Sequence, residues 1–95
     1  MEIHQLKTFV AVAREGSITR ASERLHLSQP AVSAHIKAIE ETLGLTLFER
    51  TPRGMSLTLD GQRLFAKAEQ TLVAHRELIE EATQLVIKIP DNFEA

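Results

Sequence analysis

The sequence has no cysteine, tryptophan or tyrosine, and its four aromatic residues are all phenylalanine. The absence of cysteine excludes disulfides and thiolate metal sites, which fits a reducing compartment. Few aromatic rings are available to stack on bases, so a binder of RNA or single strands is not expected. No apolar run approaches the roughly eighteen residues of a membrane span, and no signal-peptide pattern opens the chain, so no membrane partner is expected.

Patterns typical of catalysis are also missing. The four glycines are scattered singly, so there is no glycine-rich phosphate loop. The four histidines do not have the spacing of a zinc protease, and no serine lies in a strand–turn–helix elbow. We therefore expect no catalytic residues, no metal and no cofactor in this chain.

Positive charge is scarce overall but unevenly distributed. The chain carries 11 Lys and Arg against 13 Asp and Glu, a net charge of −2. Residues 1–58 hold seven cations against six acids, and residues 59–95 hold four against seven. Any affinity for nucleic acid must therefore come from locally placed cations and not from a global field.

The first 58 of the 95 residues predict one small, mostly helical domain. Residues 1–15 place Ile3, Leu6 and Phe9 at helical spacing ahead of Gly16, which predicts a core helix. Residues 17–43 predict two helices joined by a short turn, a helix-turn-helix. Ser17 and Ser28 have the chemistry of N-caps, and Pro30 suits a first helical turn.

The second helix of the pair is expected to bury a stripe made of Val32, Ile36, Ile39 and Leu43. Its opposite face begins with small and polar residues and one cation. A glutamine can pair with adenine, a serine hydroxyl can donate or accept, and proline or alanine can touch a thymine methyl. The residues predicted for a DNA major groove are Gln29, Pro30, Ala31, Ser33, Ala34 and Lys37. The alternative is the solvated face of an ordinary helical hairpin.

The helix that starts at Ser17 is expected to cross the DNA backbone, because the first helix of such a pair does so. Arg20 could meet a phosphate there. Arg24 could do the same, or could form a surface pair with Glu23 or Glu40.

Residues 48–57 predict a small β-hairpin around the turn 51–54, where proline and glycine both favour a reversal. After a recognition helix, such a hairpin is a wing that can contact phosphates or the minor groove. Arg50, Thr51 and Arg53 make up the predicted wing contacts, and the alternative is a surface hairpin with solvated arginines.

From Thr58 a long helix is predicted, ending near residue 88 ahead of Pro90. Its apolar positions follow a 3-4 spacing over about three heptads. These positions, with His75 filling one gap, are called the seam below: Phe65, Ala68, Leu72, His75, Ile79, Ala82 and Val86. The seam predicts a homodimer through a parallel or antiparallel helix pair. Alternatively, the helix frays in isolation or packs on another domain.

Several segments together resemble the DNA-binding domain of the LysR-type bacterial transcriptional regulators. They are residues 1–13, 16–25, 27–33, 36–44, 47–50 and 57–61. The resemblance implies a mostly α fold: a winged helix-turn-helix of three helices and a two-stranded wing, then a long dimerising linker helix. It implies a DNA-binding domain over 1–58, a linker helix over 59–88, and a tail over 89–95 toward a missing effector-binding domain.

By the same resemblance, Gln29, Pro30, Ser33 and Lys37 face the major groove, and Arg50 and Arg53 belong to the wing. Ser17, Thr19, Arg20 and Ser28 lie near phosphates. One departure concerns Ala34 and His35, where the family often has Arg followed by Gln. Either thymine methyls are then contacted by apolar groups, or His35 and Lys37 carry more of the recognition.

The function expected is that of a cytoplasmic, dimeric bacterial regulator that binds double-stranded DNA sequence-specifically. A small-molecule inducer would bind the missing C-terminal domain. The full-length protein could be either a dimer or a tetramer. The alternative is a winged-helix protein-interaction module without sequence-specific DNA binding, which the net acidic charge favours.

Overall fold

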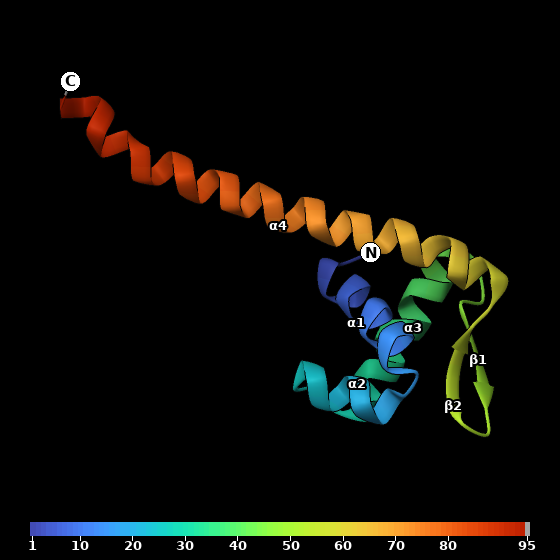
Figure 1. Cartoon of the computed structure of the whole chain (residues 1–95). Coiled ribbons are helices and arrows are strands. Elements are labelled where there is room, and N and C mark those ends of the chain that lie inside the picture. The colour runs from blue at the N-terminus through green and yellow to red at the C-terminus, as the bar shows by residue number, and fades with distance from the viewer. Residues whose placement is uncertain (95) are drawn as a thin grey trace.

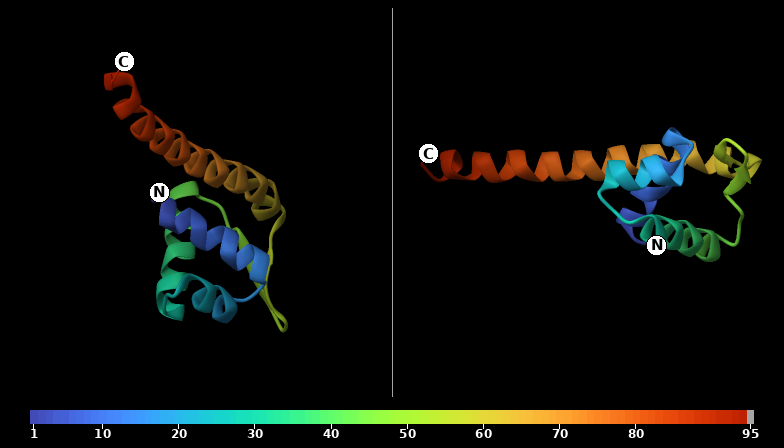
Figure 2. Two further views of the ribbon diagram at one scale, coloured as in Figure 1. Left: turned by 60° about the vertical axis from the view of Figure 1, so that its left-hand side comes forward. Right: turned by 90° about the horizontal axis from the view of Figure 1, so that it is seen from below.

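A computed structural model describes the backbone of residues 1–94 and the side chains of residues 1–87. Three helices and a hairpin form a body from which a long helix projects (Figures 1 and 2), with overall extents of 63 × 25 × 19 Å. The elements are α1 (Ile3–Glu15), α2 (Ile18–Leu25), α3 (Gln29–Leu43), β1 (Phe48–Thr51), β2 (Gly54–Leu57) and α4 (Leu59–Glu94). The predicted winged helix-turn-helix is confirmed.

The core of the body surrounds α1, which packs against α2, α3 and α4. Phe9 is its anchor: the ring is 2% exposed and meets Phe48 and Phe65 edge-on, with centroids 5.6 and 6.4 Å away. Edge-to-face pairs of this kind add to the free energy gained from burial. The short helix pair is thus held in place by a third helix, as the sequence predicts.

Side-chain caps and glycines set the helix boundaries at the predicted places. The hydroxyls of Ser17, Ser28 and Thr58 accept hydrogen bonds from backbone amides three residues later, at 3.0–3.2 Å. Gly16 and Gly44 end α1 and α3 in the left-handed conformation, with φ of 65° and 69°. Each hydroxyl satisfies an amide that the first helical turn leaves without a partner.

The hairpin pairs β1 and β2 antiparallel, with Arg50 opposite Met55 and Thr51 opposite Gly54. The Thr51 hydroxyl organises the turn, because it donates to the Gly54 carbonyl (3.2 Å) and accepts from the Arg53 amide (3.3 Å). The predicted wing is therefore present, and Thr51 shapes its tip.

The first half of α4 packs on the body, whereas its second half projects away from it (Figure 1). The helix continues to Glu94, so the prediction that it ends near residue 88 is wrong. A proline lacks one amide donor and crowds the preceding turn, which weakens a helix without always ending it. Within the described residues, no helix is both long and apolar enough to cross a membrane.

One further expectation about the core is not met in the structure. Leu43 and Leu45 are 40% and 37% exposed, although Leu43 was predicted to belong to the buried stripe of α3. They flank Gly44, whose left-handed conformation turns the chain, and Leu47 fills the core instead.

Candidate nucleic-acid interface

The starts of α2 and α3 and the tip of the hairpin lie together at the end of the body away from α4 (Figures 1 and 2). They surround a groove, called the DNA-facing groove below because the sequence predicts DNA contacts for several residues of its lining. Its lining includes residues from all three sequence-predicted sets: Ser17, Thr19, Gln29, Pro30, Ser33, Arg50 and Thr51. Arg20, Ser28, Ala31, Ala34, Lys37 and Arg53 are not part of its lining. The fold thus gathers on one surface segments that are far apart in the sequence.

The recognition helix α3 presents its predicted face to the outside. Gln29, Pro30, Ser33, Ala34 and Lys37 are all exposed, whereas Ala31 is half-buried. The opposite face is held by Val32, Ile36 and Ile39, which lie in the core. Because the buried stripe fixes the rotation of the helix, the polar first turns must point outward.

The predicted phosphate contacts lie at the starts of helices. Ser17 and Ser28 occupy the N-cap positions of α2 and α3, and Thr19 and Arg20 are exposed in the first turn of α2. Amide groups and the positive end of the helix dipole at such positions favour a phosphate oxygen.

Cations on this surface have no acidic partner. Among the side chains of residues 1–87, Arg20, Lys37, Arg50 and Arg53 form no ion pair. The two ion pairs join Arg14 to Glu69 (2.7 Å) and Arg24 to Glu15 (3.6 Å). Arg24 therefore pairs with neither Glu23 nor Glu40, the partners considered from the sequence.

His35 is turned toward α1 and not toward the outward face. Its Nδ1 lies 2.8 Å from the hydroxyl of Thr8, which is fully buried, and its ring centroid is 5.0 Å from that of His4. The Thr8 hydroxyl also donates to the His4 carbonyl at 3.0 Å. This leaves Lys37, and not His35, on the outward face beside Ala34.

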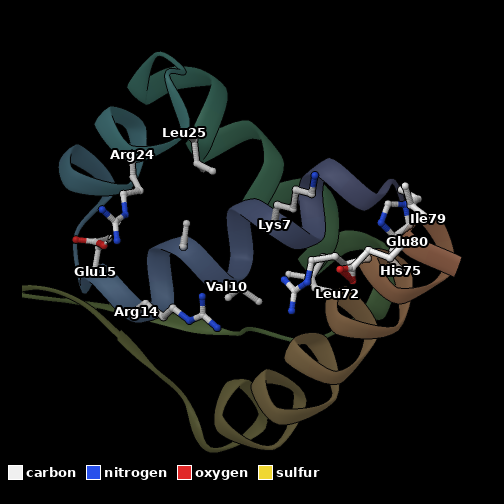
Figure 3. A pocket seen from close by; sticks show the side chains of 12 residues that line it. Lys7, Val10, Arg14, Glu15, Arg24, Leu25, Leu72, His75, Ile79 and Glu80 are labelled. Carbon is white, nitrogen blue, oxygen red and sulfur yellow. Dashed lines mark ion pairs between the residues drawn. The ribbon is translucent and has the colours of Figure 1, made fainter. Parts of the chain in front are cut away.

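A second groove runs between α1, α2 and α4 (Figure 3) and is called the α4 groove below. Val10, Leu25, Leu72 and Ile79 supply its apolar lining. Cationic side chains of Lys7, Arg14, Arg24 and Arg76 also line it, together with the acids Glu15 and Glu80. This groove is separate from the DNA-facing groove.

The predicted seam of α4 divides into two halves. Ala68 is buried, and Phe65, Leu72 and His75 are half-buried against the body. Ile79, Ala82 and Val86 are exposed, with Ile79 at 54% and Val86 at 65%. Three other large apolar side chains of this half, Leu78, Leu85 and Ile87, are exposed as well.

Sequence reasoning missed four residues that line the DNA-facing groove: Ile18, Pro52, Gly54 and Met55. They reach it only because the hairpin folds back beside the turn between α1 and α2, a tertiary contact without a local sequence signal. Among the described residues, no group of three His, Asp or Glu side chains could hold a metal ion.

Comparisons with known proteins agree with this geometry. The family model described as "Bacterial regulatory helix-turn-helix protein, lysR family" matches residues 3–62. The chain is 49% identical over 72 residues to the HTH-type transcriptional regulator ClcR of Pseudomonas putida, covering 76% of this chain and 24% of ClcR. It is 50% identical over 72 residues to the regulator YofA of Bacillus subtilis, covering 76% and 25% of the two chains. The chain thus spans about a quarter of the length of these relatives.

Two solved structures are similar in fold as well as in sequence. The CbnR_DBD–DNA complex superposes with a TM-score of 0.85 at 36% identity, covering 90% of this chain and 99% of the other. The BenM_DBD/catB site 1 DNA complex gives a TM-score of 0.87 at 32% identity, with 90% and 97% covered.

Proposed function

Because the chain belongs to the LysR family of bacterial helix-turn-helix regulators, we propose that it binds duplex DNA sequence-specifically as a homodimer. The chain contains the DNA-binding domain of a LysR-type transcriptional regulator, and the family is not one of enzymes. The two similar structures are complexes with DNA.

The DNA-facing groove carries the proposal, because it joins three kinds of contact on one surface. The first turns of α3 would enter the major groove, with Gln29, Ser33 and Lys37 at the base edges. The starts of α2 and α3 would hold phosphates through Ser17, Thr19, Arg20 and Ser28. Arg50 and Arg53 of the hairpin would reach the backbone or the minor groove.

A second copy of the chain would cover the exposed half of α4. Its apolar side chains have no partner among the described residues, and a heptad seam is the usual basis of helix pairing. An antiparallel pair would bring this half over the α4 groove of the other copy. The groove supplies an apolar lining and the cations Lys7 and Arg76, which form no ion pair among the described side chains. The helix supplies apolar side chains flanked by Glu77 and Glu81. A two-fold dimer would then present two copies of α3 to two half-sites.

For the whole protein we propose regulation by a small-molecule inducer that binds outside this chain. The proposal rests on the relatives, which are transcriptional regulators about four times as long as the matched segment. A DNA target in bacteria places such a protein in the cytoplasm, on the nucleoid.

Selection from random duplex DNA tests the proposed function. The enriched duplex is then titrated against a scrambled duplex of the same length at two salt concentrations. We expect a site with two-fold symmetry whose affinity falls as salt rises while its advantage over the scrambled duplex persists, because phosphate contacts release counterions on every sequence.

No enrichment, together with weak and sequence-indifferent binding at low salt, would contradict the proposal. That result would favour the alternative of a winged-helix module that binds protein.

A further inference from the structure

The second strand of the wing is fastened to the turn between α1 and α2. The Met55 amide donates to the Gly16 carbonyl at 3.0 Å. Gly54, the residue before it, has a φ of 132°, a conformation that other residues rarely adopt. A Cβ at Gly54 would overlap the carbonyl oxygen of Gly16. Only glycine therefore allows β2 to approach this turn so closely.

The first strand of the wing is fastened to the recognition helix through Glu40. One carboxylate oxygen of Glu40 accepts hydrogen bonds from the amides of Leu47 (2.7 Å) and Phe48 (3.4 Å). Its backbone carbonyl accepts from the amides of Gly44 (2.8 Å) and Leu45 (3.2 Å). One residue thus ends α3 and also holds the start of β1.

These two attachments join the wing to the elements that face DNA. Gly16 directly precedes Ser17, the N-cap of α2, and Glu40 lies about one helical turn beyond Lys37 on α3. A two-stranded hairpin has little stability of its own, so its direction has to be set by what it is fastened to.

We propose that Gly54 and Glu40 are positioning residues that fix the wing relative to the recognition helix. They hold Arg50 and Arg53 where these side chains can contact the duplex that α3 reads. A wing that is already in place loses little conformational entropy when DNA binds, so its contacts contribute fully to affinity. This inference rests on the proposed function, because it assigns the wing a role in binding DNA.

Gly54→Ala tests the attachment to α2, with dissociation constants measured on the selected duplex. We expect an affinity loss of about tenfold, and a smaller dependence of affinity on salt because wing contacts are lost. Ser56→Ala is the matched control: Ser56 lies on the same strand with an exposed side chain and should change neither quantity. Circular dichroism at the same temperature verifies that each variant is folded.

The decisive measurement is a double-mutant cycle with Arg53→Ala. If the attachment positions Arg53, removing Arg53 should weaken binding several-fold in the wild type but very little in the Gly54→Ala background. A merely structural role for Gly54 would leave the cost of Arg53→Ala the same in both backgrounds, and that result would overturn the inference.

Glu40 gives an independent test, because it lies on α3 and not on the wing that carries Arg53. Glu40→Gln keeps a side-chain oxygen that can accept from both amides, and Glu40→Ala removes it. We expect Glu40→Ala to show the same coupling to Arg53→Ala, and Glu40→Gln to restore most of the affinity. Equal affinities for Glu40→Ala and the wild type would contradict the role of Glu40. A wild-type protein that prefers no duplex would instead overturn the proposed function itself.

Discussion

Gln29 is the side chain of α3 best suited to read a base. It is exposed on the first turn, lines the DNA-facing groove, and can donate and accept at the edge of an adenine. We expect Gln29→Ala to relax the preference at one base pair of each half-site, by about 1–3 kcal/mol. Titrating wild type and variant against duplexes changed one base pair at a time measures this effect.

Arg53→Ala is the matched comparison for Gln29→Ala. Arg53 lies at the tip of the wing and has no ion-pair partner among the described residues, so a phosphate or groove contact is its expected role. Its loss should weaken binding to all sequences alike and lower the salt slope by about 1. If both variants lose affinity equally on every duplex, the division between base reading and backbone contact is wrong.

Thr8 and His35 form a polar contact within an apolar helix interface. Thr8→Val preserves the shape of the side chain but leaves Nδ1 of His35 without its partner, so we expect a loss of about 1 kcal/mol in the free energy of unfolding. Urea denaturation measures it. In a His35→Ala background the same substitution should cost clearly less, and strictly additive effects would contradict a direct contribution of this hydrogen bond.

The orientation of His35 marks a limit of prediction from sequence at this scale. The outward face of α3 could be predicted because the apolar stripe of Val32, Ile36 and Ile39 fixes the rotation of the helix. His35 lies between the two faces, and its direction is decided by Thr8, 27 residues earlier in the chain. Helical spacing carries no information about such a partner.

At the scale of the element, Ser28 combines two roles that can be separated. It caps α3 through the Ala31 amide, and we propose that it lies near a phosphate. Ser28→Ala should lower the free energy of unfolding by about 1 kcal/mol. Ser28→Asp should restore stability, since aspartate caps helices equally well, but should weaken DNA binding roughly tenfold through repulsion of a phosphate. Thermal denaturation and DNA titration measure the two effects.

Retained DNA affinity in Ser28→Asp would show that Ser28 acts as a cap alone. Gln70→Asp on the exposed side of α4 is a useful control, because it adds the same charge without touching a helix cap or the wing.

Element boundaries were predictable where a single residue decides them. Ser17, Ser28 and Thr58 each satisfy an amide within their own helix, so local chemistry is sufficient. The attachments of the wing were not predictable, because the Met55 amide meets Gly16 only after the chain has folded. The predicted end of α4 is wrong for a different reason. Pro90 was expected to end the helix, although a helix can continue past a proline.

At the scale of the whole molecule, the surface predicted to contact DNA and the projecting half of α4 carry different charges. The unpaired cations Arg20, Arg50 and Arg53 lie on α2 and the wing, whereas the second half of α4 carries Glu77, Glu80 and Glu81. A net charge of −2 is therefore compatible with DNA binding, because residues 59–95 carry three more acids than cations, whereas residues 1–58 carry one more cation than acids. The same division leaves the exposed apolar residues of α4 available for a second copy.

Ile79→Glu tests the dimer and its link to DNA binding together. Ile79 belongs to the seam, is 54% exposed and lines the α4 groove, so a carboxylate there would replace apolar contacts of the proposed dimer with a group that costs free energy to desolvate. Sedimentation equilibrium should show a monomer at concentrations where the wild type is dimeric. Affinity for the two-fold site should fall by roughly a hundredfold or more, because each half-site then binds without the linkage to the other.

Gln84→Glu makes the same charge change on the side of α4 opposite the seam, where helical geometry keeps it away from a partner helix. It should leave both the mass and the affinity unchanged, and circular dichroism should show equal helix content in the two variants. If Ile79→Glu stays dimeric, the seam does not form the interface. If it becomes monomeric and still binds the two-fold site with wild-type affinity, dimerisation and DNA recognition are not coupled through α4.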